Sequence, residues 1–249
     1  MINGLPCDSR RNKLHSEAIV GNMGSWVILN KLANNSITMR PIIQEITTKF
    51  AGTDVFIIGG GNSLRNFNFD SLKGKNVIAL NSAYKYVDEN AVLYWADATW
   101  GGSNHDKGLF DHPSKFKFSS RINADTLIQS NKLGAGGCHW LKKTGDYGYD
   151  PNVNNVRGNN SGANAINFAI NLHANRVILL GFDMGYVFGR THFHDHHEQV
   201  TASRTYTEQF IPSIESLAKE IKHLPVKIIN CSNHSNLKCF EFGDIKDYL

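Results

Sequence analysis

Six short apolar runs recur along the chain from Asp54 onward, and they constrain the fold more than any other feature. The runs are Val55–Ile58, Val77–Leu80, Val92–Trp95, a weaker Phe116–Phe118, Val177–Leu180 and Val226–Ile229. Their length and their β-branched residues predict strands that are buried on both faces of a sheet. Helical periodicity separates them, most clearly at Gly162–His173 and Thr205–His223. This alternation predicts an α/β fold with a doubly wound, mostly parallel sheet.

Polar residues and glycines follow these runs, where each strand is predicted to end. In a doubly wound sheet the carboxyl ends of the strands border the ligand site. The residues found there are Gly59, Gly60, Gly61, Asn62 and Ser63 after the first run, Asn81 and Ser82 after the second, Asp97 after the third, Asp183 after the fifth, and Asn230 and Ser232 after the sixth. Their convergence predicts a binding site along one edge of the sheet.

The glycine turn at residues 59–63 is typical of a strand-to-helix loop that holds phosphate. It is not a Walker P-loop, because no Gly-Lys-Ser/Thr sequence follows. It also departs from the dinucleotide fingerprint, since Leu64 stands where the third glycine belongs and Asn81, not an acidic residue, follows the second strand. The turn therefore favours phosphate binding and disfavours NAD. The alternative is a tight turn that needs glycine without any ligand.

A second candidate lies in the sequence VRGNNSGANA, residues 156–165. Asn160 or Ser161 is a natural helix N-cap, and Gly162 leaves the helix N-terminus open. Amides at the positive end of a helix dipole suit an anion, and Arg157 adds positive charge. We therefore interpret these four residues as part of the nucleotide site, with plain helix capping as the alternative.

The sequence THFHDHHE, residues 191–198, gathers four histidines and two acidic residues. His192, His194 and His197 are candidates for a general base, because histidine titrates near neutral pH. Imidazole and carboxylate groups also bind zinc or iron, although the spacing matches no helical HExxH motif. A solvated loop without a chemical role is the third interpretation.

Two aspartates complete the predicted site. Asp97 and Asp183 each follow a predicted strand, where a carboxylate can hold magnesium on a nucleotide's phosphates or accept a hydrogen bond from a ribose. A helix-capping or turn-forming role is the alternative. Magnesium is thus one option for a cofactor, and the identity of any metal stays open.

The rest of the sequence limits location and partners. No apolar stretch reaches the roughly 18 residues that span a bilayer, and the early polar residues do not resemble a signal peptide. The four cysteines show no CxxC spacing, so we expect a reduced, cytoplasmic setting. A net charge of +4 does not by itself indicate nucleic acid.

Helix-like patterns at Ser16–Leu32 and Pro41–Phe50 predict a helical N-terminal extension at residues 1–50, before a single domain at residues 51–249.

These motifs together resemble a known group. The sequences VFIIGGGNSL, VIALNSAY, YWADATW, RGNNSGANAINFAINLHANRVILLGFDM, HFHDHH and VKIINCSNHSNLKCF resemble phage and prophage Rossmann-like proteins described as MptE-like, after the archaeal 6-hydroxymethylpterin diphosphokinase. The layout from about Asp54 to the C-terminus is also similar to that of bacterial sialyltransferases that use CMP-sialic acid. For a phage protein, the resemblance implies the host cytoplasm.

In those sialyltransferases three features hold the cytidine nucleotide: the glycine turn, the Asn after the second strand and the Ser-Gly helix start. A late histidine is the base. The resemblance implies nucleotide binding by residues 59–63, by Asn81 and by residues 160–162 of this chain. The sialyltransferases usually have Gly-x-Gly-Pro-Ser-Leu, where this chain has Asn62 in place of Pro. Tyrosines assist their leaving phosphate, and Tyr186 and Tyr206 are the candidates for that role here.

Three functions follow from these patterns. The first is a nucleotide-sugar-dependent glycosyltransferase with a histidine base, whose acceptor is a glycan or modified DNA. The second is an ATP- and magnesium-dependent diphosphokinase of the pterin-kinase type, in which Asp97 and Asp183 hold the metal. The third is a phage protein that binds a nucleotide without catalysis. Fold alone does not decide among them, and self-association into an oligomer stays open.

Overall fold

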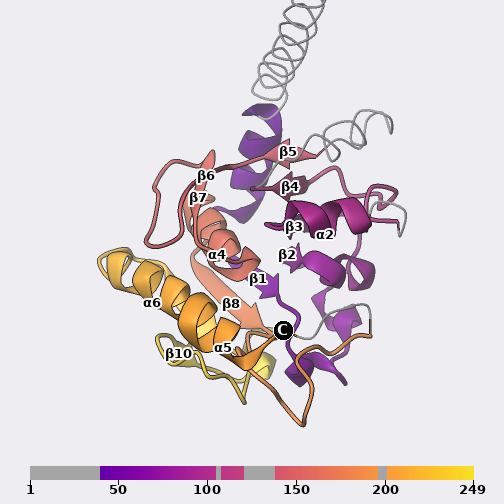
Figure 1. Ribbon diagram of the computed structural model, residues 1–249. Coiled ribbons are helices and arrows are strands. Elements are labelled where there is room, and N and C mark those ends of the chain that lie inside the picture. The colour runs from indigo at the N-terminus through magenta and orange to yellow at the C-terminus, as the bar shows by residue number, and fades with distance from the viewer. Residues whose placement is uncertain (1–39, 105–107, 121–137, 196–200) are drawn as a thin grey trace, which may run out of the picture. The chain divides into compact units, whose positions relative to one another are not determined.

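The predicted strands lie side by side in one parallel sheet (Figure 1). The computed structural model describes residues 40–104, 108–120, 138–195 and 201–249. Across the sheet the order is β10 (Glu241–Phe242), β9 (Lys227–Asn230), β8 (Arg176–Leu180), β1 (Asp54–Ile58), β2 (Asn76–Leu80), β3 (Val92–Trp95), β4 (Lys117–Ser119) and β5 (His139–Trp140). Each neighbouring pair is parallel. The predicted doubly wound, Rossmann-like α/β sheet is confirmed.

Four strands are absent from the sequence-based prediction. β5 and β10 have two residues each, which is too short for any hydrophobic period to show. β6 (Lys142–Gly145) and β7 (Asn155–Arg157) form a separate parallel pair. Both are polar and partly exposed, so they lack the apolar runs that reveal the strands of the main sheet.

The helices confirm the main periodic segments and divide one of them. α4 (Ser161–Asn171) begins one residue before the predicted start. The segment predicted from Thr205 is divided into α5 (Ser203–Thr205), a π-helical turn at Tyr206–Phe210 and α6 (Ile211–Glu220). α2 (Ala98–Ser103) follows β3, and 3-10 helices at Asn62–Leu64, Phe69–Leu72, Asn81–Tyr86 and Ile245–Asp247 occupy other connections.

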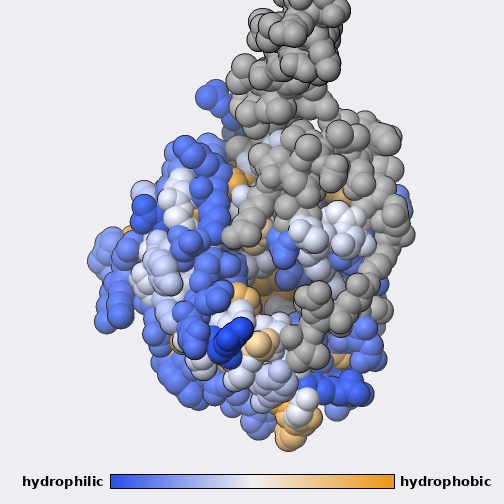
Figure 2. All heavy atoms as spheres, viewed as in Figure 1, coloured by the Kyte–Doolittle hydropathy of each residue, from blue (hydrophilic) through white to orange (hydrophobic). Residues whose placement is uncertain are grey.

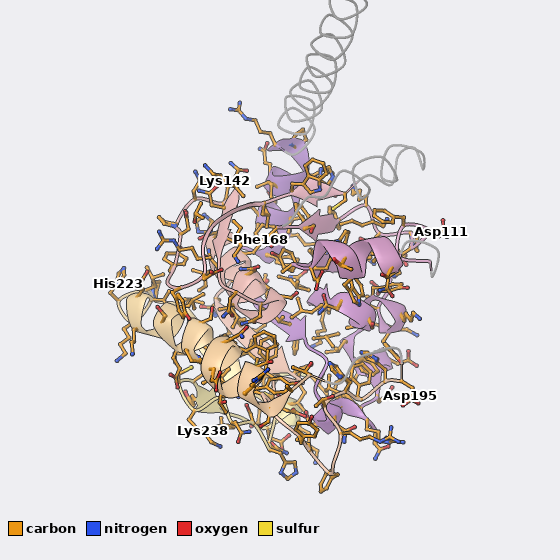
Figure 3. The ribbon with its side chains drawn as sticks, in the orientation of Figure 1. Asp111, Lys142, Phe168, Asp195, His223 and Lys238 are labelled. Carbon is orange, nitrogen blue, oxygen red and sulfur yellow. The ribbon has the colours of Figure 1, made fainter. Side chains whose placement is uncertain are left out.

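Both faces of the central strands are buried, as the apolar runs predict. One hydrophobic cluster takes alternate residues of four strands, namely Phe56, Ile58, Val77, Ala79, Leu93, Trp95, Ile178 and Leu180. The residues between them, such as Val55 and Ile57, are also fully buried, and α4 contacts β1, β2, β3 and β8. Phe168 of α4 packs against Phe118 of β4, with 5.1 Å between the ring centroids (Figure 3). The sheet is thus a rigid base for the residues at its edge.

The winding of the sheet reverses between β1 and β8. The chain passes from β1 through β2, β3 and β4 to β5 in one direction, and then returns to β8 on the other side of β1 before continuing to β9 and β10. A doubly wound sheet has its crevice at such a reversal, outside the carboxyl ends of the strands. The loops after β1 and β8 are therefore the expected walls of a binding site.

The chain divides into two compact units, Met1–Pro41 and Ile42–Leu249. Residues 40–50 are helical, and Ile46 and Phe50 are fully buried. The unit that contains the sheet therefore begins at Ile42, earlier than the boundary at residue 50 expected from the sequence. The helix expected at residues 16–32 lies outside the described residues. Within the described ranges, no helix combines the length and apolar character needed to cross a bilayer.

Candidate functional site

A cavity of about 450 Å³ opens at the carboxyl ends of β1, β2, β3 and β8, where the winding reverses. Its lining includes most of the residues that the sequence predicts for the site: Gly59, Gly60, Gly61, Asn81, Asp97, Asn160, Ser161, Gly162, Asp183, His192 and His194. Segments that are more than 100 residues apart in the sequence therefore meet here. His197 lies outside the described residues.

The glycine turn after β1 uses most of its amides within the protein. The amide of Gly59 donates to the carbonyl of Leu180 at 2.7 Å, and that of Gly61 donates to the carbonyl of Gly181 at 2.8 Å. The amide of Ser63 donates to the Asp183 carboxylate at 2.8 Å. A phosphate cradle needs several amides that point at the ligand. This turn is therefore less well equipped for phosphate than its sequence suggests.

The glycines allow the ends of β1 and β8 to approach closely. A Cβ atom on Gly61 would lie 2.6 Å from the carbonyl oxygen of Gly181 and 2.5 Å from Cγ of Asp183. Gly181 has a φ of +68°, and a Cβ atom on it would lie 2.6 Å from the side chain of Leu64. Packing between two strand ends thus explains the glycine sequence directly.

Two residues of the predicted turn support the site without lining the cavity. Asn62 is buried, and its Nδ2 donates to the carbonyl of Val187 at 2.9 Å. The hydroxyl and amide of Ser63 both donate to the carboxylate of Asp183. Both residues therefore fix the loop after β8 against the loop after β1.

Asp183 is a buried carboxylate where the loop after β8 meets the loop after β1. Its burial raises the pKa of the carboxyl, while the hydrogen bonds from Ser63 and the nearby His234 act in the opposite direction. Oδ1 accepts the Ser63 hydroxyl and Oδ2 accepts the Ser63 amide. Because both oxygens already have protein donors, Asp183 is poorly placed to act as a magnesium ligand.

Asn81 and Ser161 connect the ends of β2 and β3 to the start of α4. Asn81 has a φ of +49°, a left-handed conformation that asparagine adopts more readily than most residues. The Ser161 hydroxyl donates to Oδ1 of Asn81 at 3.3 Å and accepts from the amide of Ala96 at 3.1 Å. The polar atoms of both residues therefore meet at the cavity wall, as the strand-end pattern predicts.

The N-terminus of α4 faces the cavity with two amides available. Oδ1 of Asn160 accepts the amide of Ala163 at 3.0 Å, and the carbonyl of Asn160 accepts the amide of Asn164. The first amides of a helix have no partner within it. The amides of Ser161 and Gly162 accordingly remain for a ligand, and both residues line the cavity. Capping and anion binding are compatible here, because they use different amides.

The histidine loop also borders the cavity, through His192 and His194. The ring of His192 lies against the glycine turn, since a Cβ atom on Gly60 would be 2.9 Å from its Cδ2. The hydroxyl of Thr191 lies 2.8 Å from Nδ1 of His192. His194 is buried, and its ring centroid is 5.7 Å from that of His192. Two imidazoles therefore border the same cavity as the start of α4.

Arg157 is not brought to the cavity. It lies in β7, where its side chain packs beside Gly145. Burial opposes ionisation of the Asp150 carboxyl, but the hydrogen bonds that it accepts, and then the charge of Arg157, lower its pKa overall. Asp97 does line the cavity, but its Oδ1 caps α2 by accepting the amides of Thr99 and Trp100. Helix capping is one of the roles that the sequence allows for Asp97, beside magnesium and ribose binding.

No group of three histidine, cysteine or acidic side chains within the described ranges is arranged to hold a metal ion. His196, His197 and Glu198 lie outside those ranges, so the metal interpretation of the full histidine loop stays a prediction. Among the cavity-lining residues that the structure describes, lysine and arginine are both absent. An anion in the cavity would rely on amides, hydroxyls and imidazoles.

The segment after the histidine loop supplies lining residues that the motif analysis missed. Thr201, Thr205, Gln209 and Phe210 border the cavity together with Tyr206. The π-helical turn at Tyr206–Phe210 places Tyr206 there, and no sequence pattern announces such a turn. Burial raises the pKa of the Tyr206 phenol, which therefore stays a hydrogen-bond donor near neutral pH.

The comparisons with known proteins add no family. No protein-family model matches the chain, and no curated protein matches it. One solved structure, a proposed fructose-1,6-biphosphate aldolase from Coccidioides immitis, is 11% identical over 77% of this chain and 72% of that one, with a TM-score of 0.24. A likeness at that level says nothing about this site, so the fold class rests on the order and direction of the strands.

Proposed function

We propose that the chain is a glycosyltransferase that uses a nucleotide-activated sugar. The observation that carries the proposal is the position of the α4 N-terminus and of two histidines around one cavity. A helix start stabilises a phosphate, and an imidazole near neutral pH removes a proton from a hydroxyl group. Transfer of a sugar from a nucleotide to an alcohol is accelerated by a base for the acceptor and by donors for the leaving phosphate.

The reaction assigns a role to each wall of the cavity. His192 or His194 takes the proton of an acceptor hydroxyl, whose oxygen forms a bond to the anomeric carbon of the sugar. The bond between that carbon and the phosphate oxygen breaks, and the nucleotide leaves with the electron pair. The amides of Ser161 and Gly162 and the phenol of Tyr206 stabilise the negative charge that develops on the phosphate.

The diphosphokinase alternative needs magnesium, and the two aspartates suit it less well. Both carboxylate oxygens of Asp183 accept hydrogen bonds from Ser63, and Oδ1 of Asp97 accepts two amides. Magnesium requires near-ideal octahedral geometry and carboxylate oxygens that are free to coordinate it. These hydrogen bonds favour the glycosyltransferase over the kinase.

A thermal-shift panel of CMP, UDP, GDP, ADP and ATP, each with magnesium or with EDTA, tests the donor site. A ligand at 100 times its Kd adds about 2.7 kcal/mol of stability, which raises Tm by roughly 5–10 °C for a chain of this size. We expect one nucleotide to do so equally in EDTA. A shift that requires ATP with magnesium would favour the kinase, and no shift with any nucleotide would overturn the proposal.

Single variants then separate catalysis from binding. The donor is a sugar derivative of the nucleotide that raises Tm. Its hydrolysis, or the transfer of its sugar to an acceptor, is measured. We expect His192→Ala or His194→Ala to keep the nucleotide shift and to lower turnover by about 10²–10⁴-fold. His223→Ala is the matched control, because His223 is exposed just after α6 (Figure 3) and is not among the cavity-lining residues. Unchanged turnover in both cavity variants would show that neither histidine is the base, whereas a wild type that binds the nucleotide without any turnover would favour a nucleotide-binding protein without catalysis.

A further inference from the structure

A tight hairpin projects between two segments that line the cavity. Val187 and Arg190 exchange backbone hydrogen bonds of 2.9 and 3.1 Å, so Phe188 and Gly189 are the two central residues of the turn. Their φ values are +50° and +76°. Positive φ at both central positions is the pattern of a type I′ turn. Gly185 before the hairpin and Thr191 after it both border the cavity.

Phe188 is an unfavourable residue for this position. Type I′ turns favour asparagine or glycine at the first central residue, and a positive φ is strained for a bulky side chain. Burial does not compensate, because Phe188 is 85% exposed. The coloured surface in Figure 2 is predominantly hydrophilic, and among the described residues the next most exposed large hydrophobic side chain, Tyr147, is only 50% exposed. Strain of this kind, beside a cavity, points to function rather than to folding.

The hairpin is held firmly on three sides. Val187 is buried, and its carbonyl accepts Nδ2 of Asn62 at 2.9 Å. The Tyr186 hydroxyl donates to the carbonyl of Thr201 at 3.1 Å. Nδ2 of Asn236 donates to the carbonyl of Met184 at 3.1 Å. The backbone that carries Phe188 is therefore held in place, which lowers the entropy cost of binding a partner.

The groups around the ring are polar and largely neutral. The Phe188 and His234 rings pack edge to face, with 5.4 Å between centroids and an interplanar angle of 73°. Tyr186 is 46% exposed nearby in the sequence. The hairpin's cation, Arg190, forms an ion pair with Asp195 at 3.1 Å. An aromatic face beside an imidazole, with an exposed phenol two residues away in the sequence, suits a ligand that has one apolar face and a rim of hydroxyl groups.

We propose that Phe188, with His234 and Tyr186, forms an acceptor subsite that stacks on the apolar face of a neutral saccharide ring. The inference rests on the proposed function, because an acceptor sugar must reach the histidines that border the cavity. The hairpin leads directly into the loop that carries those histidines. A saccharide fits better than a phospholipid or nucleic acid surface, since the hairpin's positive charge is already paired.

An array of immobilised oligosaccharides, neutral and anionic, tests this subsite with the full-length protein. We expect the wild type to bind one or more neutral oligosaccharides and the Phe188→Asn variant to bind them at least 10-fold more weakly. Asparagine suits the type I′ turn, so the same variant should melt roughly 2–4 °C higher than the wild type. Loss of binding together with gained stability would show that the ring serves the ligand and not the fold.

The matched control is Phe242→Ala, because Phe242 is another exposed phenylalanine, 42% accessible, on the edge strand β10. It should bind the array as the wild type does. Three outcomes would each overturn the subsite. They are equal binding by Phe188→Asn and the wild type, no binding of any neutral saccharide, and Phe188-dependent binding only to phosphatidylglycerol vesicles. The nucleotide shift is measured independently, so an array failure with an intact shift removes the subsite and leaves the proposed function standing.

Discussion

Asp183 shows how one side chain can join two loops and still border a cavity. It holds Ser63 through both carboxylate oxygens, and it lies against the place where Gly61 has no side chain. Its position after a strand predicts a polar residue at the cavity edge, and the structure agrees. Its partner, 120 residues earlier in the chain, is a contact that no local pattern contains.

The raised pKa of Asp183 predicts a specific pH dependence of stability. The folded state binds the proton more tightly than the unfolded state, in which the pKa is near the ordinary 3.8. Stability contributed by this group is therefore fully present below about pH 3.8 and is lost as the pH rises through the folded pKa. Asp183→Asn cannot ionise, so the Tm of the wild type relative to that of the variant should fall as the pH rises.

Differential scanning fluorimetry of both proteins between pH 3.5 and pH 8 measures this difference. Ionisable groups that do not interact with Asp183 are present in both proteins, so their contributions cancel in the comparison to a first approximation. A difference in Tm that stays constant across the whole range would contradict a raised pKa. Asp183→Ala, which leaves the partly buried Ser63 amide without its acceptor, should be less stable at every pH by about 1–3 kcal/mol.

At the scale of elements, α4 is the part of the site that the sequence predicts best. Asn160 before an apolar helical period predicts the cap, and the structure has that cap. The glycine turn is predicted less well, because its amides donate to carbonyls of β8 and of the residue after it. Those contacts depend on the order of strands in the sheet, which no local sequence pattern predicts. Arg157 fails for the same reason, since β7 pairs with β6 outside the main sheet.

A charge at the cap tests whether the start of α4 binds an anion. Asn160→Asp keeps an acceptor for the amide of Ala163 and interacts favourably with the helix dipole, so we expect Tm to change by only a few degrees. The added negative charge lies beside the amides of Ser161 and Gly162 and should abolish the nucleotide-induced shift. The same thermal-shift panel measures both effects.

Asn160→Ser is the control for this substitution. It keeps a neutral capping oxygen and, like the aspartate, lacks the Nδ2 group that donates to Asn159 and Phe210. Any loss of the nucleotide-induced Tm shift that depends on those two hydrogen bonds should therefore appear in both variants. If Asn160→Asp retains the nucleotide shift of Asn160→Ser, the phosphate does not bind at the start of α4.

For the molecule as a whole, the parallel sheet brings distant segments to one edge. The six apolar runs predict the strands, and the rule for doubly wound sheets predicts that the site lies at their carboxyl ends. The cavity is there. The sequence could not show that β8 lies beside β1, nor that a π-helical turn closes the cavity with Tyr206, because both depend on packing between segments far apart in the chain.

The convergence of these segments gives a prediction for hydrogen exchange. A nucleotide that stabilises the protein should slow amide exchange together at residues 59–63, 159–164 and 181–194, because all three segments border the cavity. The largest change should occur at Ser161 and Gly162, whose amides gain a partner. Gly59 and Gly61 should change least within their segment, since they already donate to β8 and its following loop. The peptide that contains β10, at the edge of the sheet, should exchange equally with and without nucleotide. Protection confined to the glycine turn would instead place the phosphate there, as the sequence alone suggests.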